Sequence, residues 1–147
     1  MDIYSYLKKD HRKVSDLMDE VLAARSPAER DEIFDEINEE LTLHAETEQA
    51  TFYAALEREE ETEEKIEDAE EDHEEIKKYL AKLSFMSAES EKWLELFGEL
   101  KHAVEHHVRD EENRIFEKAR QVLDDDEAEQ LAEDMDRMKE EAMSEAA

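Results

Sequence analysis

Histidines and glutamates interrupt apolar helix faces at several points of this sequence. Within residues 93–116, apolar residues recur at three- and four-residue intervals, and His107 and Glu111 take positions where this pattern calls for core side chains. His44 and Glu48 interrupt a second apolar stripe in the same way, again four residues apart. That spacing places two side chains on one helix face, one turn apart. Because a buried ionised glutamate is costly unless it is paired or binds a metal, the pattern indicates an inward-facing metal site.

His11 and His73 lie on the apolar faces of two further predicted helices. Each of the four histidines falls near the middle of its own helical segment. If short connections make the four helices run up and down in turn, these histidines share one layer of the bundle, with each glutamate one turn away. A single histidine on an apolar face is usually a satisfied core residue, whereas four at one level with two glutamates favour metal. The predicted ligands are His11, His44, Glu48, His73, His107 and Glu111.

The composition indicates that helices position these residues. A chain of 147 residues is long enough for one domain with a core, and its single glycine, single proline and many Glu, Ala, Leu and Lys residues disfavour strands and frequent turns. Ser26, Pro27 and Glu29 mark a clear helix start. Weaker starts lie at Thr62 and Ser87. We expect helices over about 2–24, 27–58, 62–84, 88–122 and 125–143.

The predicted fold is all-α: an up-down-up-down four-helix bundle over residues 1–122, followed by a C-terminal helical extension over residues 123–147. The first helix is expected to direct an apolar face that includes Val21 and Leu22 into the bundle. The additional C-terminal helix is expected to be short and strongly charged, with a thin apolar stripe of Leu131, Met135 and Met138. We therefore expect it to pack outside the bundle or to fray.

The donor atoms limit which metal such a site would hold. Cysteine is absent, which excludes disulfides and thiolate ligands and leaves nitrogen and oxygen donors. Imidazole and carboxylate donors suit iron, manganese or zinc. Six ligands are too many for one four-coordinate structural zinc, and they suit two ions that share the two carboxylates. Open coordination positions would remain, which favours a redox or small-molecule site over a purely structural one.

The charge balance excludes some partners. With 19 basic against 47 acidic residues the net charge is −28, so the acidic chain lacks the basic surface that nucleic acid requires. Salt should relieve the self-repulsion of such a protein, which points to a halophilic source. No apolar run approaches the roughly 20 residues that span a bilayer, and the first residues lack the apolar core of a signal peptide. We expect a cytoplasmic protein without membrane or nucleic-acid partners, and the sequence names no protein partner.

Four short motifs follow one another in a distinctive order: His11, HAETE, DHEEI and HHVRDEENRIF. Over about residues 3–120 they resemble the motifs of the hemerythrin-like (HHE cation-binding) domain family. The resemblance implies an up-down four-helix bundle with a non-haem di-iron centre, in which Glu48 and Glu111 bridge two iron ions and the histidines are terminal ligands. Oxygen-carrying members have a further histidine one turn after the third-helix ligand, where this chain has Lys77. That lysine either points outward or contacts a bound ligand.

On this basis we interpret the chain as a di-iron protein that binds dioxygen, nitric oxide or another small redox ligand, for sensing, storage or a stress response. Manganese or zinc could substitute for iron. No active-site base or substrate pocket is legible, so binding is favoured over enzymatic turnover. Two alternatives stay open. One is an oxidoreductase acting on peroxide or nitric oxide, or an iron–sulfur repair protein; the other is a metal-free structural or interaction bundle.

A few further residues are ambiguous in the sequence. His102 and His106 fall off the apolar stripe and are expected at the surface, although His106 is the rival of His107 as a ligand. Gly98, inside a predicted helix, is explained by close helix approach, by ligand access or by a simple packing accommodation. The four tyrosines could touch the site or sit at the bundle ends, and nothing in the sequence chooses between these positions.

Overall fold

Helices make up nearly all of the chain in the computed structural model, which describes residues 1–146. In chain order the elements are α1 (Ile3–Ala23), α2 (Pro27–Glu48), η1 (Gln49–Tyr53), α3 (Ala54–Glu57), α4 (Glu63–Ser84), α5 (Glu91–Asp110), η2 (Glu111–Ile115), α6 (Phe116–Val122) and α7 (Asp125–Ala146). The prediction of an all-α fold is confirmed. Ala147, the last residue of the predicted C-terminal extension, lies outside the described residues. No helix within residues 1–146 is both long and apolar enough to span a membrane.

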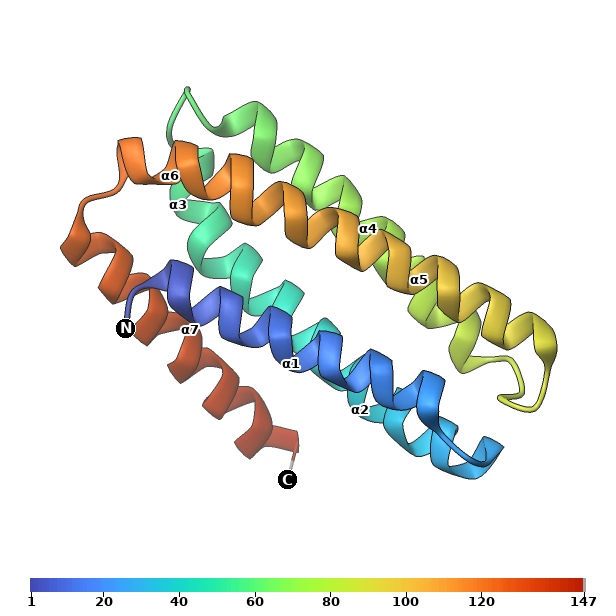
Figure 1. The fold of residues 1–147 in the computed structure, drawn as a ribbon. Helices are drawn as coiled ribbons and strands as arrows, with labels where there is room; N and C mark the ends of the chain where they lie inside the picture. Colours follow the sequence, from blue (N-terminus) through green and yellow to red (C-terminus); the bar gives the residue numbers. More distant parts are fainter. Residues whose placement is uncertain (147) are drawn as a thin grey trace.

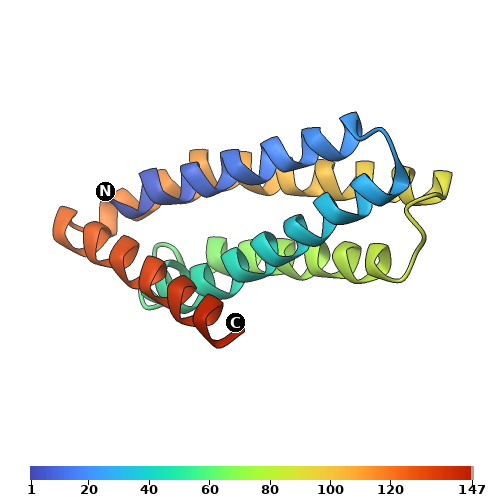
Figure 2. The same cartoon turned by 90° about the horizontal axis from the view of Figure 1, so that it is seen from below.

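The two π-helical turns η1 and η2 continue α2 into α3 and α5 into α6, so each of these pairs forms one long rod. α1 packs against α2, and α4 packs against α5. Figure 1 shows that the short connections within both pairs lie at one end of the molecule, and the connection from α3 to α4 lies at the other end. Figure 2 shows α7 (red) lying obliquely beside the rods, where it contacts α1 and α2. The four rods are therefore α1, α2 with α3, α4, and α5 with α6, and residues at their middles meet in the interior.

Of the three predicted caps, Ser26 is confirmed, whereas Thr62 and Ser87 do not cap their helices. The Ser26 hydroxyl accepts a hydrogen bond from the Glu29 backbone N–H at 3.1 Å, as the sequence predicts for the start of α2. Thr62 takes the predicted position before α4, but it does not cap that helix. Its hydroxyl instead donates to the carbonyl oxygens of Leu56 and Glu59. Thr62 therefore closes the end of α3.

The start of α5 is later than predicted. Ser90 is the cap, because its hydroxyl accepts a hydrogen bond from the Lys92 backbone N–H at 3.1 Å, and the helix begins at Glu91. Ser87, the predicted cap, accepts a hydrogen bond from the Glu89 backbone N–H at 3.2 Å within the connection. Both serines make local turns of the same kind, so residue type alone does not distinguish them.

Two apolar clusters fill the interior, one on each side of the histidine layer. The first contains Val14, Met18, Val21, Phe34, Ile37, Leu83, Trp93, Phe97 and Leu100, and the second contains Ile3, Leu7, Phe52, Leu56, Ile66, Phe116 and Met135. Along α1, for example, Leu7 belongs to the second cluster, Val14 to the first, and His11 lies between them. The same order holds along the other three rods. The polar layer is therefore enclosed by hydrophobic side chains at both ends.

One predicted packing role, that of Leu22, is wrong, and one of the three explanations considered for Gly98 is excluded. Leu22 is 55% exposed, because the neighbouring Val21 takes the buried position on that turn of α1. A Cβ atom at Gly98 would meet no atom within 4 Å, so close helix approach does not explain this glycine.

α7 is longer and better packed than predicted. It comprises 22 residues, and Ala128, Ala132 and Met135 on it are buried. Leu131 and Met138, two members of the predicted apolar stripe, are only half-buried. Two small side chains and Met135 are therefore buried on α7, and the helix lies against α1 and α2 instead of fraying.

Candidate metal centre

The structure brings the six predicted ligands together in the interior. Glu48 and Glu111 are fully buried, and the four histidines are between 4% and 9% exposed. The ligand atoms form two groups, in each of which all atoms lie within 4.8 Å of one another. One group consists of His11, His44, Glu48 and Glu111, and the other of Glu48, His73 and His107. The two groups share Glu48, as expected of two adjacent ions.

The four histidines form two pairs, His11 with His44 and His73 with His107. Each carboxylate faces one histidine of each pair. Glu48 Oε1 lies 3.4 Å from His44 Nε2 and 3.2 Å from His73 Nε2. Glu111 directs Oε1 toward His11 Nε2 at 3.2 Å and Oε2 toward His107 Nε2 at 3.5 Å. The His73 and His107 Nε2 atoms are 3.1 Å apart. The two carboxylates therefore lie between the two pairs of histidines.

Several polar atoms of the site have no hydrogen-bond partner among the described residues. These buried atoms are His11 Nε2, His44 Nε2, both Glu48 carboxylate oxygens, Glu111 Oε1 and His73 Nδ1. Unpartnered buried polar groups are rare and costly, and those of charged groups most of all. His11 Nε2 faces Glu111 Oε1 and His44 Nε2 faces Glu48 Oε1 at the shared centre, where bound metal ions would satisfy these atoms. The residues present therefore fit a metal-binding role.

Three further carboxylates orient the histidines from outside. The contacts are Asp10 Oδ2 to His44 Nδ1 at 2.9 Å, Glu112 Oε2 to His11 Nδ1 at 2.8 Å and Asp72 Oδ2 to His107 Nδ1 at 3.3 Å. A carboxylate that accepts from Nδ1–H fixes the tautomer and leaves Nε2 free to bind a metal. Sequence reasoning missed all three. Each one is adjacent in sequence to a predicted ligand, but such neighbours are common in a chain with 47 acidic residues.

The π-helical turns lie directly at the two glutamates. η1 follows Glu48, and η2 begins with Glu111. A π-turn bonds residue i to residue i+5, and it is frequent at functional sites. The wider turn places the residue five positions after Glu48, which is Tyr53, on the same face as the glutamate. The Thr51 hydroxyl donates to the Thr47 carbonyl oxygen at 2.7 Å, which satisfies a carbonyl in this widened turn.

Tyr53, whose position the sequence left open, lies beside the predicted ligands. Its side chain is fully buried, and its hydroxyl donates a short hydrogen bond to Glu111 and lies 3.3 Å from His107 Nε2. The ring stacks on His73 with centroids 5.2 Å apart. Burial and the negative charge of Glu111 raise the pKa of Tyr53 well above its usual range, so without metal the hydroxyl keeps its proton. Tyr53 thus adds a protonated hydroxyl group to the site.

Electrostatic interactions in the metal-free site favour the charged forms of His44 and Glu111. Burial alone would lower the pKa of His44, but Glu48 and Asp10 outweigh it and raise that pKa to about 9. Burial alone would raise the pKa of Glu111, but hydrogen bonding, chiefly to His107, holds it well below its usual range. Protons on His11, His44 and His107, whose pKa values are all raised, therefore balance the negative charge of Glu111 when metal is absent. Metal ions must displace these protons.

A small cavity adjoins the histidines on one side. Its volume is about 30 Å³, and its lining includes all four predicted histidine ligands together with Val14, Leu41, Ile76, Val104 and Val108. Asp10 also lines the cavity, whereas Glu48, Glu111 and Tyr53 do not, so apolar side chains border the site on the cavity side and these three polar residues lie on the other, polar side. A cavity needs ~10–15 Å³ to hold one water molecule, so this one has room for a ligand of two or three atoms.

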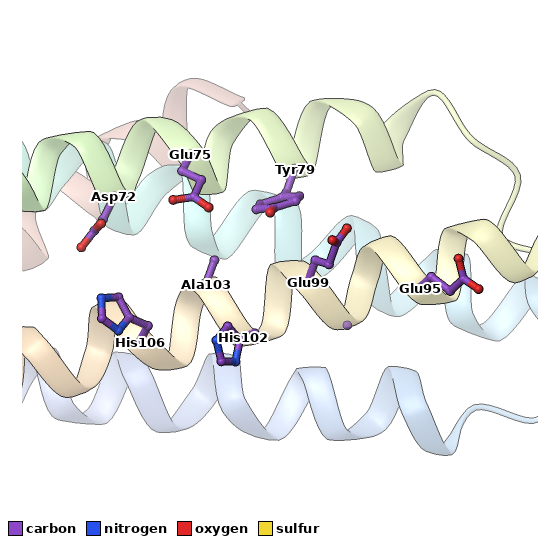
Figure 3. Close-up of a pocket in the computed structure, with 9 residues that line it drawn as sticks. Asp72, Glu75, Tyr79, Glu95, Glu99, His102, Ala103 and His106 are labelled. Carbon is purple, nitrogen blue, oxygen red and sulfur yellow. The ribbon is translucent and has the colours of Figure 1, made fainter.

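His102 and His106 lie outside the site, as predicted. Both are exposed on α5 and line a surface groove between α4 and α5, where Figure 3 shows them beside Asp72 and Glu99. Neither belongs to a group of three or more converging ligand atoms among residues 1–146. Lys77 is exposed, so of the two orientations considered the outward one is observed.

Fold and site together define an all-helical protein with a buried histidine and carboxylate centre for metal cations. Residues 2–119 match the family model of the hemerythrin HHE cation-binding domain. The chain belongs to this family, and the resemblance inferred from the motifs is confirmed.

Two similar proteins extend this finding. The crystal structure of a hemerythrin HHE cation-binding domain-containing protein from Mycobacterium kansasii superposes with a TM-score of 0.86 at 26% identity, covering 99% of this chain and 90% of that one. A DNA nickase from Nostoc sp. is 28% identical over 132 residues, which cover 90% of this chain. The chain spans only 37% of that relative's length.

Proposed function

We propose that the protein is a non-haem di-iron protein that binds dioxygen, nitric oxide or another small redox ligand. The observation that carries this proposal is the pair of ligand groups that share Glu48 beside a small cavity, which apolar side chains line together with the histidines. His11 and His44 would hold one ion, His73 and His107 the other, and the two glutamates would serve both. Bound iron would supply open coordination positions and a change of oxidation state. Manganese and zinc accept the same donors, but zinc offers no redox chemistry.

The chain's own residues would control which ligands reach the ions. The valine, leucine and isoleucine side chains of the cavity favour small uncharged molecules, because a charged ligand would lose its hydration there. Tyr53 holds a proton beside Glu111 and His107, on the polar side of the site. The outer carboxylates keep three histidines in the tautomer that binds metal. Together these features support a preformed site for small-ligand binding.

The two adjacent histidines of α5 provide a matched test of the metal centre. His107 is buried at the site, whereas His106 is exposed in the groove. After anaerobic reconstitution with ferrous iron, we expect about two irons per chain in the parent and in His106→Ala, and fewer in His107→Ala. Elemental analysis with a protein assay measures this ratio. No bound iron in the parent, or equal loss in both variants, would contradict the proposal and favour a metal-free structural bundle.

The cavity provides a test of the ligand. Val104 lines it and is 7% exposed, so Val104→Ile should fill part of its 30 Å³, and Val104→Ala should enlarge it. We expect Val104→Ile to bind nitric oxide and dioxygen more weakly, by about tenfold if one contact of ~1.4 kcal/mol is lost, and Val104→Ala to bind at least as well as the parent. Titration of the reduced, iron-loaded proteins measures both affinities, and iron content should be unchanged. Equal affinities in the two variants would show that ligands bind elsewhere.

A second candidate function is an oxidoreductase acting on peroxide or nitric oxide. Tyr53 favours it, because a buried hydroxyl that keeps its proton next to the ions could donate that proton during a reaction. Multiple turnovers with an electron donor or with peroxide would distinguish this function from binding alone. The net charge of −28 opposes contact with phosphates, which argues against DNA nicking by this chain.

We propose that residues 1–122 form an up-down-up-down four-helix bundle that holds the site, and that residues 123–147 are an appended helical extension. We also propose that the acidic surface is adapted to high salt, which screens repulsion among its carboxylates.

A further inference from the structure

We propose that α7 is coupled to the metal centre, so that docking of α7 and occupancy of the His11/His44 half of the site stabilise each other through Lys139 and Asp10. This inference rests on the proposed metal site and concerns its regulation.

One carboxylate oxygen joins α7 to a predicted ligand. The Lys139 ammonium on α7 donates a short hydrogen bond to Asp10 Oδ2, and the same oxygen lies 2.9 Å from His44 Nδ1. The side chains of Lys139 and Asp10 are only 13% and 18% exposed. The pair is therefore largely shielded from water and from screening by salt. The position of Lys139 fixes the Asp10 carboxylate, which in turn fixes the ring of His44.

The position of Lys139 depends on how α7 docks. The Tyr6 hydroxyl on α1 donates to Asp136 Oδ1 at 3.0 Å, and the Lys139 ammonium lies 4.9 Å from the centre of the Tyr6 ring. Met135, one turn earlier, is fully buried against the second apolar cluster. Polar and apolar contacts thus hold the segment that carries Lys139. If α7 moved away, Asp10 would lose this partner.

The link is specific to one half of the site. Among residues 1–146, the bonds of Glu112 to His11 and of Asp72 to His107 are not joined by a hydrogen bond from a lysine or arginine. A change in α7 would therefore act first on the ion held by His44. Because coupling between two equilibria is reciprocal, metal binding must stabilise the docked α7 by the same factor by which docking raises metal affinity. A partner that binds α7 could then sense the state of the site.

The first experiment compares metal affinity in three full-chain variants, with Zn²⁺ as a redox-inert probe in competition with a chelator. Lys139→Met removes the bond to Asp10 and keeps a long side chain, and we expect about tenfold weaker binding of one of two Zn²⁺ ions, at the low end of the effect of losing an outer contact. Lys139→Arg should retain most of the affinity. Arg137→Met is the control, because Arg137 is exposed on the same helix and bonds Asp134. We expect no change in this control.

The second experiment measures the reciprocal effect by hydrogen exchange of the parent chain with and without Zn²⁺. We expect Zn²⁺ to slow exchange in residues 128–140 by a factor similar to the affinity change in Lys139→Met, and to have little such effect in the variant itself. If the parent binds two Zn²⁺ ions but Lys139→Met binds them equally well, or if exchange in α7 is insensitive to Zn²⁺, the coupling is refuted and the metal site stands. If the parent binds no metal, the proposed function fails together with the coupling.

Discussion

Removing the metal ions is expected to lower the melting temperature of the protein by roughly 10 °C. The physical reason is the set of buried polar atoms that make no hydrogen bond within residues 1–146, which include both oxygens of Glu48 and the Nε2 atoms of His11 and His44. A ligand present at 1,000 times its Kd stabilises the folded state by about 4 kcal/mol, and each kcal/mol shifts the melting temperature by roughly 2–4 °C at this chain length. Calorimetry before and after chelation measures the shift.

The acidic surface makes salt concentration the variable that must be controlled. Both samples need the same salt concentration, because self-repulsion at a net charge of −28 makes stability depend on ionic strength. Readdition of metal to the chelated sample should restore the melting temperature, and the shift should be smaller in His107→Ala. An unchanged melting temperature after verified metal loss would mean that protons on the histidines satisfy the buried carboxylates as well as metal does.

The cost of burying polar side chains also explains why most of the candidate site could be predicted from the sequence. Histidine and glutamate are conspicuous on an apolar stripe, and a straight α-helix keeps residues four apart on one face. Up to Glu48 and Glu111 both rods are regular α-helix, so the spacing rule holds for His44 with Glu48 and for His107 with Glu111. The prediction that the four histidines share one layer of the bundle followed from the short connections between long helices. These features depend on periodicity and length, which a sequence carries directly.

The features that the sequence did not predict depend on irregular backbone or on contacts between distant residues. Tyr53 reaches the site because η1 widens the helix by one residue, and a period of 3.6 residues places position 53 on another face. The contact of Lys139 with Asp10 joins residues 129 positions apart, between helices whose relative placement the sequence does not give. Small buried alanines, which carry little hydrophobic signal, pack α7 against the rods. Local patterns therefore located the ligands but not what surrounds them.

Replacing Glu48 by glutamine is expected to have the largest effect of any single change on metal content. Glu48 is the one residue common to both ligand groups, and its Oε1 atom lies within 3.4 Å of a histidine from each pair. Glutamine has nearly the same shape, but its neutral amide is a poor ligand for a divalent ion and cannot bridge two of them. We expect less than one iron per chain in Glu48→Gln after anaerobic loading, measured by elemental analysis.

Glu48→Gln should also change the stability of the metal-free protein in the opposite direction. In the parent, chelation leaves a fully buried carboxylate that makes no hydrogen bond within residues 1–146 and that faces His44 and His73 only at 3.4 and 3.2 Å. A neutral amide is less costly to bury, so the metal-free variant should be more stable than the metal-free parent by about 1–3 kcal/mol. Glu46→Gln is the matched control, because Glu46 is exposed on the same helix, and it should bind two irons with unchanged stability. If Glu48→Gln retained two irons, Glu48 would not be a shared ligand, and the proposal of a bridged pair of ions would be wrong. Lower metal content combined with higher metal-free stability is not expected of a variant that simply misfolds, so the two measurements together separate a lost ligand from a lost fold.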